Sequence, residues 1–206
     1  MHLIGLLASD QGDIDRASDW IRRAIKTKPH EPLFYRNLGS TLQKGNRLEQ
    51  ALVCYCKALE LQPNHSGTLI KMGTALASAG LHKDAVHTYR RALHLEGNSP
   101  ETLNRLGASL AALGQTGGAQ KAFQKAIYSK PSYAEAHSNL GCLYMRLGRF
   151  VEASAAFAES LRLRPAHLDS ALQLANSYQL RNLHAQAADI YQRLTKSDPE
   201  FTEAWY

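Results

Sequence analysis

The sequence holds nine histidines and three cysteines, the residue types that bind zinc and other transition metals. Two ligands on one helix face must lie about one turn apart to share an ion, as in a His-Glu-x-x-His stretch, and the sequence has no such stretch. His87 and His94 share a face of a predicted helix but lie about 10 Å apart along its axis. Cys54 and Cys56 would point to nearly opposite faces. No metal site is predicted, and the cysteines form no disulfide framework, which fits a reducing compartment.

Catalytic and phosphate-binding motifs are also missing from the sequence. Its glycine pair Gly117 and Gly118 follows no predicted strand and comes directly before Ala119. Because a nucleotide-binding loop stands between a strand and a helix, these glycines are interpreted as a weak first helical turn. The chain is therefore not expected to be an enzyme or to bind a cofactor.

The elements that would position functional residues follow a period of thirty-four residues. Repeat proteins place similar residues at equivalent packing positions, and four such series run through the chain. The alanine series is Ala17, Ala51, Ala85, Ala119, Ala153 and Ala187. The glycine series is Gly5, Gly39, Gly73, Gly107 and Gly141, with Ala175 in the last copy. The third series is Ile21, Tyr55, Tyr89, Phe123, Phe157 and Tyr191, and the fourth is Pro29, Pro63, Gly97, Pro131, Pro165 and Pro199.

Each series has a packing role in a pair of helices. Glycine on the first helix and alanine on the second let two antiparallel helices cross closely. Proline, or Gly97 in one copy, ends the second helix. The turns within the pairs fall at residues that tolerate left-handed backbone, namely Gly12, Asn46, Gly80, Gly114, Gly148 and Asn182. Each copy is thus predicted to be a helix–turn–helix unit.

This pattern resembles the tetratricopeptide repeat family, whose Trp-x2-Leu-Gly-x2-Tyr, Ala, Phe and Pro positions recur with the same period. The resemblance covers essentially the whole chain. It implies an all-α fold, a right-handed superhelical solenoid of antiparallel helix pairs. We expect one array over 1–206, with repeats at about 1–31, 32–65, 66–99, 100–133, 134–167 and 168–201 and the start of a seventh at 202–206. Because this last fragment is too short to cover the helix before it, self-association through the C-terminal end is predicted.

Charge and hydropathy limit the partners of the chain. No apolar run approaches the roughly 20 residues of a membrane span, so a cytoplasmic protein without a membrane partner is expected. The net charge is +6. Cations recur at one position of the second helices, where the family pattern places an outer, solvated face, and exposed base-stacking aromatics are missing. Nucleic acid is therefore not the expected partner. These outer cations are Arg23, Lys57, Arg91, Lys125 and Arg193.

The resemblance implies that the first helix of each repeat, helix A, lines a concave groove. Its polar, mildly basic lining includes Arg36, Asn37, Lys44, Lys71, Asn104, Arg105, Ser138, Asn139, Arg146, Gln173 and Asn176. Side-chain amides both donate to and accept from an extended peptide backbone, so asparagines of this set could grip a peptide of any sequence. The acidic members of the lining, Glu101, Glu135 and Asp169, complement helix N-termini. The cations have no such structural explanation, and they favour an acidic ligand.

Three functions follow from this interpretation. The leading one is a protein-interaction scaffold that binds an extended acidic segment in the groove, with no catalysis of its own. The second is the substrate-recognition arm of a larger glycosyltransferase or sulfotransferase, because the opening repeats are similar to those of bacterial arrays that precede such domains. Asn37 and Asn139 match the asparagine ladder of the O-linked N-acetylglucosamine transferases, whereas Lys71, Arg105 and Gln173 depart from it. The third is an RNA-binding helical array.

Overall fold

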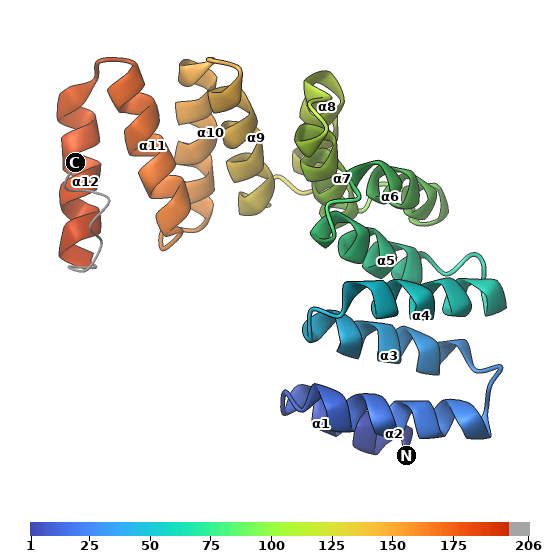
Figure 1. The fold of residues 1–206 in the computed structure, drawn as a ribbon. Coiled ribbons are helices and arrows are strands. Elements are labelled where there is room, and N and C mark those ends of the chain that lie inside the picture. The colour runs from blue at the N-terminus through green and yellow to red at the C-terminus, as the bar shows by residue number, and fades with distance from the viewer. Residues whose placement is uncertain (198–206) are drawn as a thin grey trace. The chain divides into compact units, whose positions relative to one another are not determined.

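The computed structural model describes residues 1–197, and the side chains of residues 1–195. The predicted seventh repeat, with Trp205, lies outside the described residues. All regular elements of the described part are α-helices (Figure 1). They are α1 (His2–Asp10), α2 (Ile14–Thr27), α3 (Pro32–Lys44), α4 (Leu48–Leu61), α5 (Ser66–Ser78), α6 (His82–Glu96), α7 (Pro100–Ala112), α8 (Thr116–Ser129), α9 (Ala134–Arg146), α10 (Phe150–Leu163), α11 (Leu168–Leu180) and α12 (His184–Ser197). The all-α prediction is confirmed.

The chain divides into two compact units, 1–97 and 98–206. Unit 1 contains α1 to α6, and the described part of unit 2 contains α7 to α12. Within each unit every helix packs against the next, and each helix A also contacts the helix A of the following repeat. Each unit is thus a stack of helix pairs, while the handedness of a superhelix over the whole chain stays a prediction. No helix among residues 1–197 has the length and apolar character to cross a bilayer.

The turns inside the helix pairs lie where the sequence predicted them. Asn46 and Asn182 have φ of 56° and 58°, and they are the two non-glycine residues of the described part with positive φ. Glycine holds this left-handed backbone in the other four turns, with φ between 70° and 83°. A β-branched residue would be strained there, so this turn chemistry explains why each helix A stops where it does.

The glycine series has a different neighbour from the one predicted. A Cβ added at Gly39 would lie 2.7 Å from Cε1 of Tyr55, and one added at Gly107 would lie 2.6 Å from Cε1 of Phe123. The three atoms nearest to such a Cβ are ring carbons in four repeats, so glycine makes room mainly for the aromatic series and not for the alanines. The rings fill the space between the helices because alanine, at 0–3 % exposure across the series, keeps the pair close.

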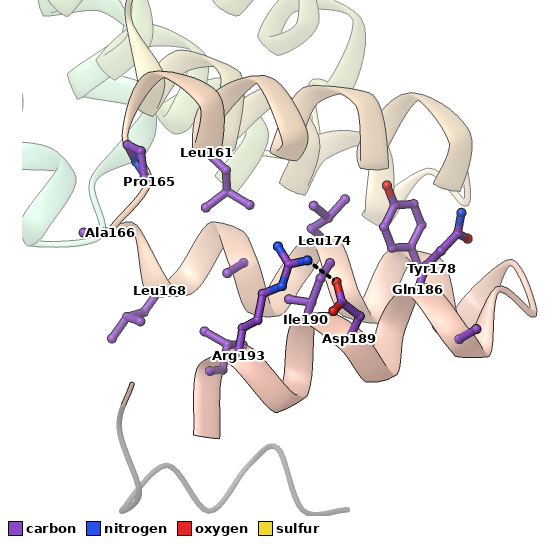
Figure 2. Close-up of a pocket in the computed structure, with 13 residues that line it drawn as sticks. Leu161, Pro165, Ala166, Leu168, Leu174, Tyr178, Gln186, Asp189, Ile190 and Arg193 are labelled. Atoms are coloured by element: carbon purple, nitrogen blue, oxygen red, sulfur yellow. Dashed lines mark ion pairs between the residues drawn. The ribbon is translucent and has the colours of Figure 1, made fainter. Parts of the chain in front are cut away.

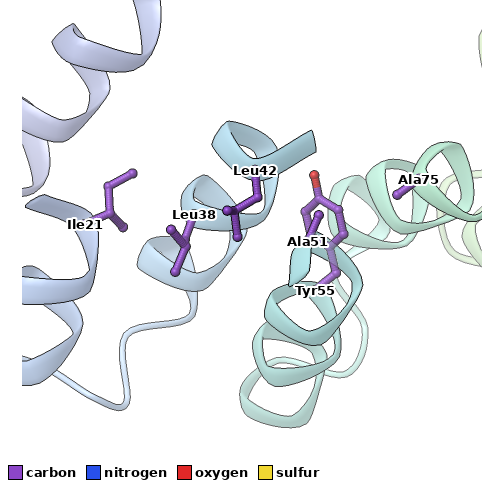
Figure 3. Packing of buried hydrophobic residues seen from close by; sticks show 6 residues of the cluster. All are labelled: Ile21, Leu38, Leu42, Ala51, Tyr55 and Ala75. Carbon is purple, nitrogen blue, oxygen red and sulfur yellow. The ribbon is translucent and has the colours of Figure 1, made fainter. Parts of the chain in front are cut away.

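The core of unit 1 shows this packing in detail (Figure 3). Tyr55 is fully buried, and it packs in one cluster with Ile21 of the preceding repeat and Ala75 of the following one. Leu38 and Leu42 fill the same cluster from α3. One repeat therefore cannot bury its own apolar surface, and the stack positions each helix A by its neighbours on both sides.

Candidate functional site

The candidate site is the inner face formed by the helices A of one unit. In unit 1 these helices are α1, α3 and α5, and in unit 2 they are α7, α9 and α11. A residue on one helix A lies beside the residue thirty-five positions later on the next: Nδ2 of Asn37 is 2.9 Å from Nε2 of His2, and Nδ2 of Asn139 donates to Oδ1 of Asn104 at 2.9 Å. We call each such pair a rung.

Arg36 and Lys71 occupy the cationic rung of unit 1. Nζ of Lys71 donates to Oγ of Ser40 at 2.7 Å, and Nη1 of Arg36 donates to Oε1 of Gln62 at 3.1 Å. Neither cation forms an ion pair with a carboxylate of the described residues, whereas Lys44 at the end of α3 pairs with Asp10 at 3.2 Å. The structure thus brings three of the predicted groove cations together on one face.

Crowding of like charges shows in the pKa of Lys71. Partial burial of its ammonium, and then the positive charges of Arg36 and Lys44, lower this pKa below its usual range. A bound anion would offset both effects, because it replaces lost solvation and neutralises the neighbouring cations. Binding of an anion at the cationic rung is therefore electrostatically favourable.

The inner face of unit 2 is mainly bonded to itself. Asn104 is buried, with its amide 3.5 Å from the Tyr133 hydroxyl in addition to its bond with Asn139. Ser138 accepts from Ser170 at 3.1 Å, Arg146 donates to the Ala111 carbonyl at 3.1 Å, and Asn176 accepts from Tyr191 at 2.7 Å. Gln173 is half-buried and Arg105 is exposed. These contacts give most of the predicted groove residues of unit 2 a structural role.

Tyrosines of the third packing series reach the inner face, which sequence reasoning missed. The Tyr55 ring is buried, yet its hydroxyl donates to Oε1 of Gln43 at 2.8 Å. The Tyr89 hydroxyl donates in the same way to Oγ1 of Thr74 at 3.2 Å. Burial raises the pKa of Tyr55, so this hydroxyl stays a donor. The sequence did carry a signal for this: the third series has tyrosine at 55 and 89, where other copies have phenylalanine, and a buried tyrosine needs a partner for its hydroxyl.

Two histidines act as helix caps. Nδ1 of His65 accepts from the Thr68 N–H at 3.0 Å, and Nδ1 of His167 accepts from the Ser170 N–H at 3.2 Å. Each is the last residue of a predicted repeat, 32–65 or 134–167, and it caps the helix that follows, α5 or α11. No group of three or more His, Cys, Asp or Glu side chains that could hold a metal ion occurs in the described part of the chain.

A separate apolar groove lies in unit 2 among α10, α11 and α12 (Figure 2). Its volume is about 950 Å³, and Leu161, Leu174 and Ile190 are among its lining residues. The fourth residue of helix A differs here from earlier copies: it is Ala171, and the earlier copies have Tyr35, Leu69, Leu103 and His137. Ala171 is one of the lining residues of the groove.

Models of the tetratricopeptide repeat match the chain at residues 1–31 and 34–65, 107–148, 134–167 and 169–200. The chain is an array of tetratricopeptide repeats. Among curated proteins, it is similar to the peroxisomal targeting signal receptors of Candida glabrata and Saccharomyces cerevisiae, at 36 % and 34 % identity over 61 residues. The matched part is 30 % of this chain and spans about a tenth of the length of each receptor.

Solved structures agree with this fold. The type IV pilus biogenesis factor PilW matches with a TM-score of 0.88 and 18 % identity, over 99 % of this chain and 94 % of its own. MamA matches with a TM-score of 0.73 and 23 % identity, over 85 % and 94 %. YrrB, described as a TPR protein with an unusual peptide-binding site, matches with a TM-score of 0.69 and 24 % identity, over 90 % and 95 %. Likeness at these identities shows the fold alone.

Proposed function

We propose that this protein is a protein-interaction scaffold that binds an extended acidic segment along the inner face of unit 1. The observation that carries the proposal is the cationic rung. Arg36 and Lys71 stand beside each other without a carboxylate partner among the described residues, and the pKa of Lys71 is lowered. Placing like charges close together costs free energy, and uncharged polar side chains would give a polar surface without that cost.

The neighbours of the cationic rung supply contacts for a peptide backbone. Asn37 lies next to Arg36 on α3, and its amide carries a carbonyl oxygen and a second N–H besides the group that faces His2. Ser40 and Gln43 follow on the same helix. Carboxylates of the ligand would therefore meet Arg36 and Lys71, while the amides hold its main chain in an extended form.

Similar proteins support a peptide partner. The relatives with up to 36 % identity are receptors for a targeting signal, and YrrB is described as having a peptide-binding site. These properties belong to those proteins. They make an extended segment a reasonable ligand here, and the acidic character comes from the cations of this chain.

Charge reversal on the inner face tests the proposal. The probe is a fluorescein-labelled peptide of alternating glutamate and glycine, and the readout is fluorescence anisotropy at low and at physiological salt. The double variant Arg36→Glu, Lys71→Glu should bind at least about tenfold more weakly, because two favourable charge contacts become repulsive. It should also lose most of the salt dependence of the association rate.

The matched control is Lys121→Glu, Lys125→Glu on α8, which changes the net charge equally at two exposed residues. Equal weakening by both double variants would mean that overall charge, and not the rung, attracts the peptide. A single-stranded RNA that bound more tightly than the peptide, and that was lost in the inner-face variant, would favour the RNA-binding alternative instead. The transferase-arm alternative stays a prediction.

A further inference from the structure

The outer face of α6 carries two arginines and two histidines close together. His87 and Arg91 are four residues apart, as are Arg90 and His94, so the four side chains cover two successive turns of one exposed helix face. They line a groove of about 520 Å³ together with Asn64, from the segment between α4 and α5, and Leu95. This face belongs to the second helix of its pair, whereas the inner-face site uses the first helices.

On four of the other second helices an outer cation pairs with a carboxylate of the same helix, whereas no ion pair of the described residues involves Arg90 or Arg91 on α6 or Lys121 or Lys125 on α8. Arg23 pairs with Asp19 at 2.9 Å on α2, and Lys57 pairs with Glu60 at 2.7 Å on α4. The positions of these acids are occupied on α6 by His87 and His94. Pairs of the same kind occur on α10 and α12, between Arg162 and Glu159 and between Arg193 and Asp189.

The carboxylates closest in sequence or packing are Asp84, Glu96 and Glu60, and none of them forms an ion pair with Arg90 or Arg91. Asp84 lies in the first turn of α6, where it complements the helix N-terminus. Glu60 lines the neighbouring groove with His87 and Arg91, but its charge is taken by Lys57. Within the described residues, no ion pair involves Arg90 or Arg91. Two permanent positive charges are therefore open to a ligand.

One contact holds the groove in shape. Nη2 of Arg91 donates to the Pro63 carbonyl at 2.7 Å, which fixes the guanidinium between α6 and the turn that carries Asn64. The other guanidinium N–H groups of Arg91 keep their donor capacity, and each histidine has at least one ring N–H whatever its tautomer. The site thus offers several donors converging on a space much larger than one oxyanion.

We propose that this groove binds a phosphorylated serine or threonine in a segment of a partner protein. A phosphate monoester carries a charge of about −1.5 to −2 and three acceptor oxygens, which suit two arginines with additional N–H donors. The four side chains span about 10 Å of a single helix, enough for one phosphate but short for a nucleic-acid backbone, which needs a continuous basic track. Leu95, 42 % exposed, supplies apolar contact for a residue next to the phosphate.

The test uses a fluorescein-labelled glycine–alanine peptide with one central phosphoserine, and its unphosphorylated twin. In anisotropy titrations the phosphopeptide should bind at least about tenfold more tightly than the twin, and Arg90→Ala, Arg91→Ala should remove most of that difference. Because Arg91 also contacts Pro63, a second variant, Arg90→Ala, His94→Ala, leaves this contact intact and should weaken binding in the same direction. The control Lys121→Ala, Lys125→Ala removes equal charge and should change binding less than about twofold.

Several outcomes would overturn the proposal. They are equal affinity for the two peptides, equal loss in the α8 control, or unchanged phosphopeptide binding in both α6 variants. If a duplex RNA bound more tightly than the phosphopeptide and required Arg90 and Arg91, the ligand of this groove would be nucleic acid and not a phosphopeptide. The inner-face variant Arg36→Glu, Lys71→Glu should leave phosphopeptide binding intact, so failure here and failure of the acidic-peptide scaffold are separate results.

Discussion

Replacing Gly107 by alanine tests the packing rule that sets the distance between the helices of each pair. The new Cβ would lie 2.6 Å and 2.7 Å from Cε1 and Cδ1 of Phe123 and 3.0 Å from its Cζ. Carbon atoms pack best at about 3.5–4.0 Å, and Phe123 is 1 % exposed, so the ring has no free space to move into. Overpacking of this kind costs about 1–3 kcal/mol.

Helix propensity acts in the opposite direction, so a matched control is needed. Alanine is preferred over glycine in a helix by about 1 kcal/mol. Gly117 in the first turn of α8 is exposed, and a Cβ there would meet no atom within 4 Å. Gly117→Ala should therefore raise the free energy of unfolding by about 0.5–1 kcal/mol. The free energy of unfolding of Gly107→Ala should be lower than that of Gly117→Ala by the overpacking cost, about 1–3 kcal/mol.

The assay is chemical and thermal unfolding of the full chain, followed by far-ultraviolet circular dichroism. Phe123→Leu provides an internal check, because the smaller side chain should relieve much of the clash and reduce the cost of Gly107→Ala in that background. If Gly107→Ala stabilised the protein as much as Gly117→Ala, the close contact between glycine and ring would not limit the helix pair, and the packing argument would be refuted.

Two further predictions concern stability. Burial, and then the positive charge of Arg36, lowers the pKa of His65 in the folded chain. As the pH falls, the unfolded chain therefore takes up the His65 proton before the folded chain does. The contribution of neutral His65 to the free energy of unfolding is fully present above about pH 6.5 and is lost as the pH falls below that value. His65→Asn keeps a cap acceptor and should flatten the denaturation midpoint against pH in this range, and an unchanged profile would exclude His65 as its source. Ala171→Leu restores the bulk found at Leu69 and Leu103 and should raise the unfolding free energy by about 1 kcal/mol by partly filling the groove of Figure 2; a lower melting midpoint would contradict this.

The sequence by itself determined the helix pairs and their turns. Each turn is local: the residue two positions beyond the end of helix A adopts positive φ, and only a few residue types do so at low energetic cost. Asn46 and Asn182 could therefore be identified beside the glycines from their spacing alone. The alanine and aromatic series were also readable as buried positions, because a residue repeated with one period must meet the same surroundings each time.

Contacts between helices, within a repeat and between repeats, were decided by the tertiary structure. Whether Gly39 faces Ala51 or Tyr55 depends on the rotation of two helices about their axes, which a residue period does not specify. The rungs depend on how far each helix A is shifted along its neighbour, and that shift places Asn139 on Asn104 and crowds Lys71 against Arg36. The sequence predicted that these residues are polar and line the inner face. The stacking of one repeat on the next decides which of them bond to each other, as Asn139 and Asn104 do, and which are cations without a carboxylate partner among the described residues, as Arg36 and Lys71 are.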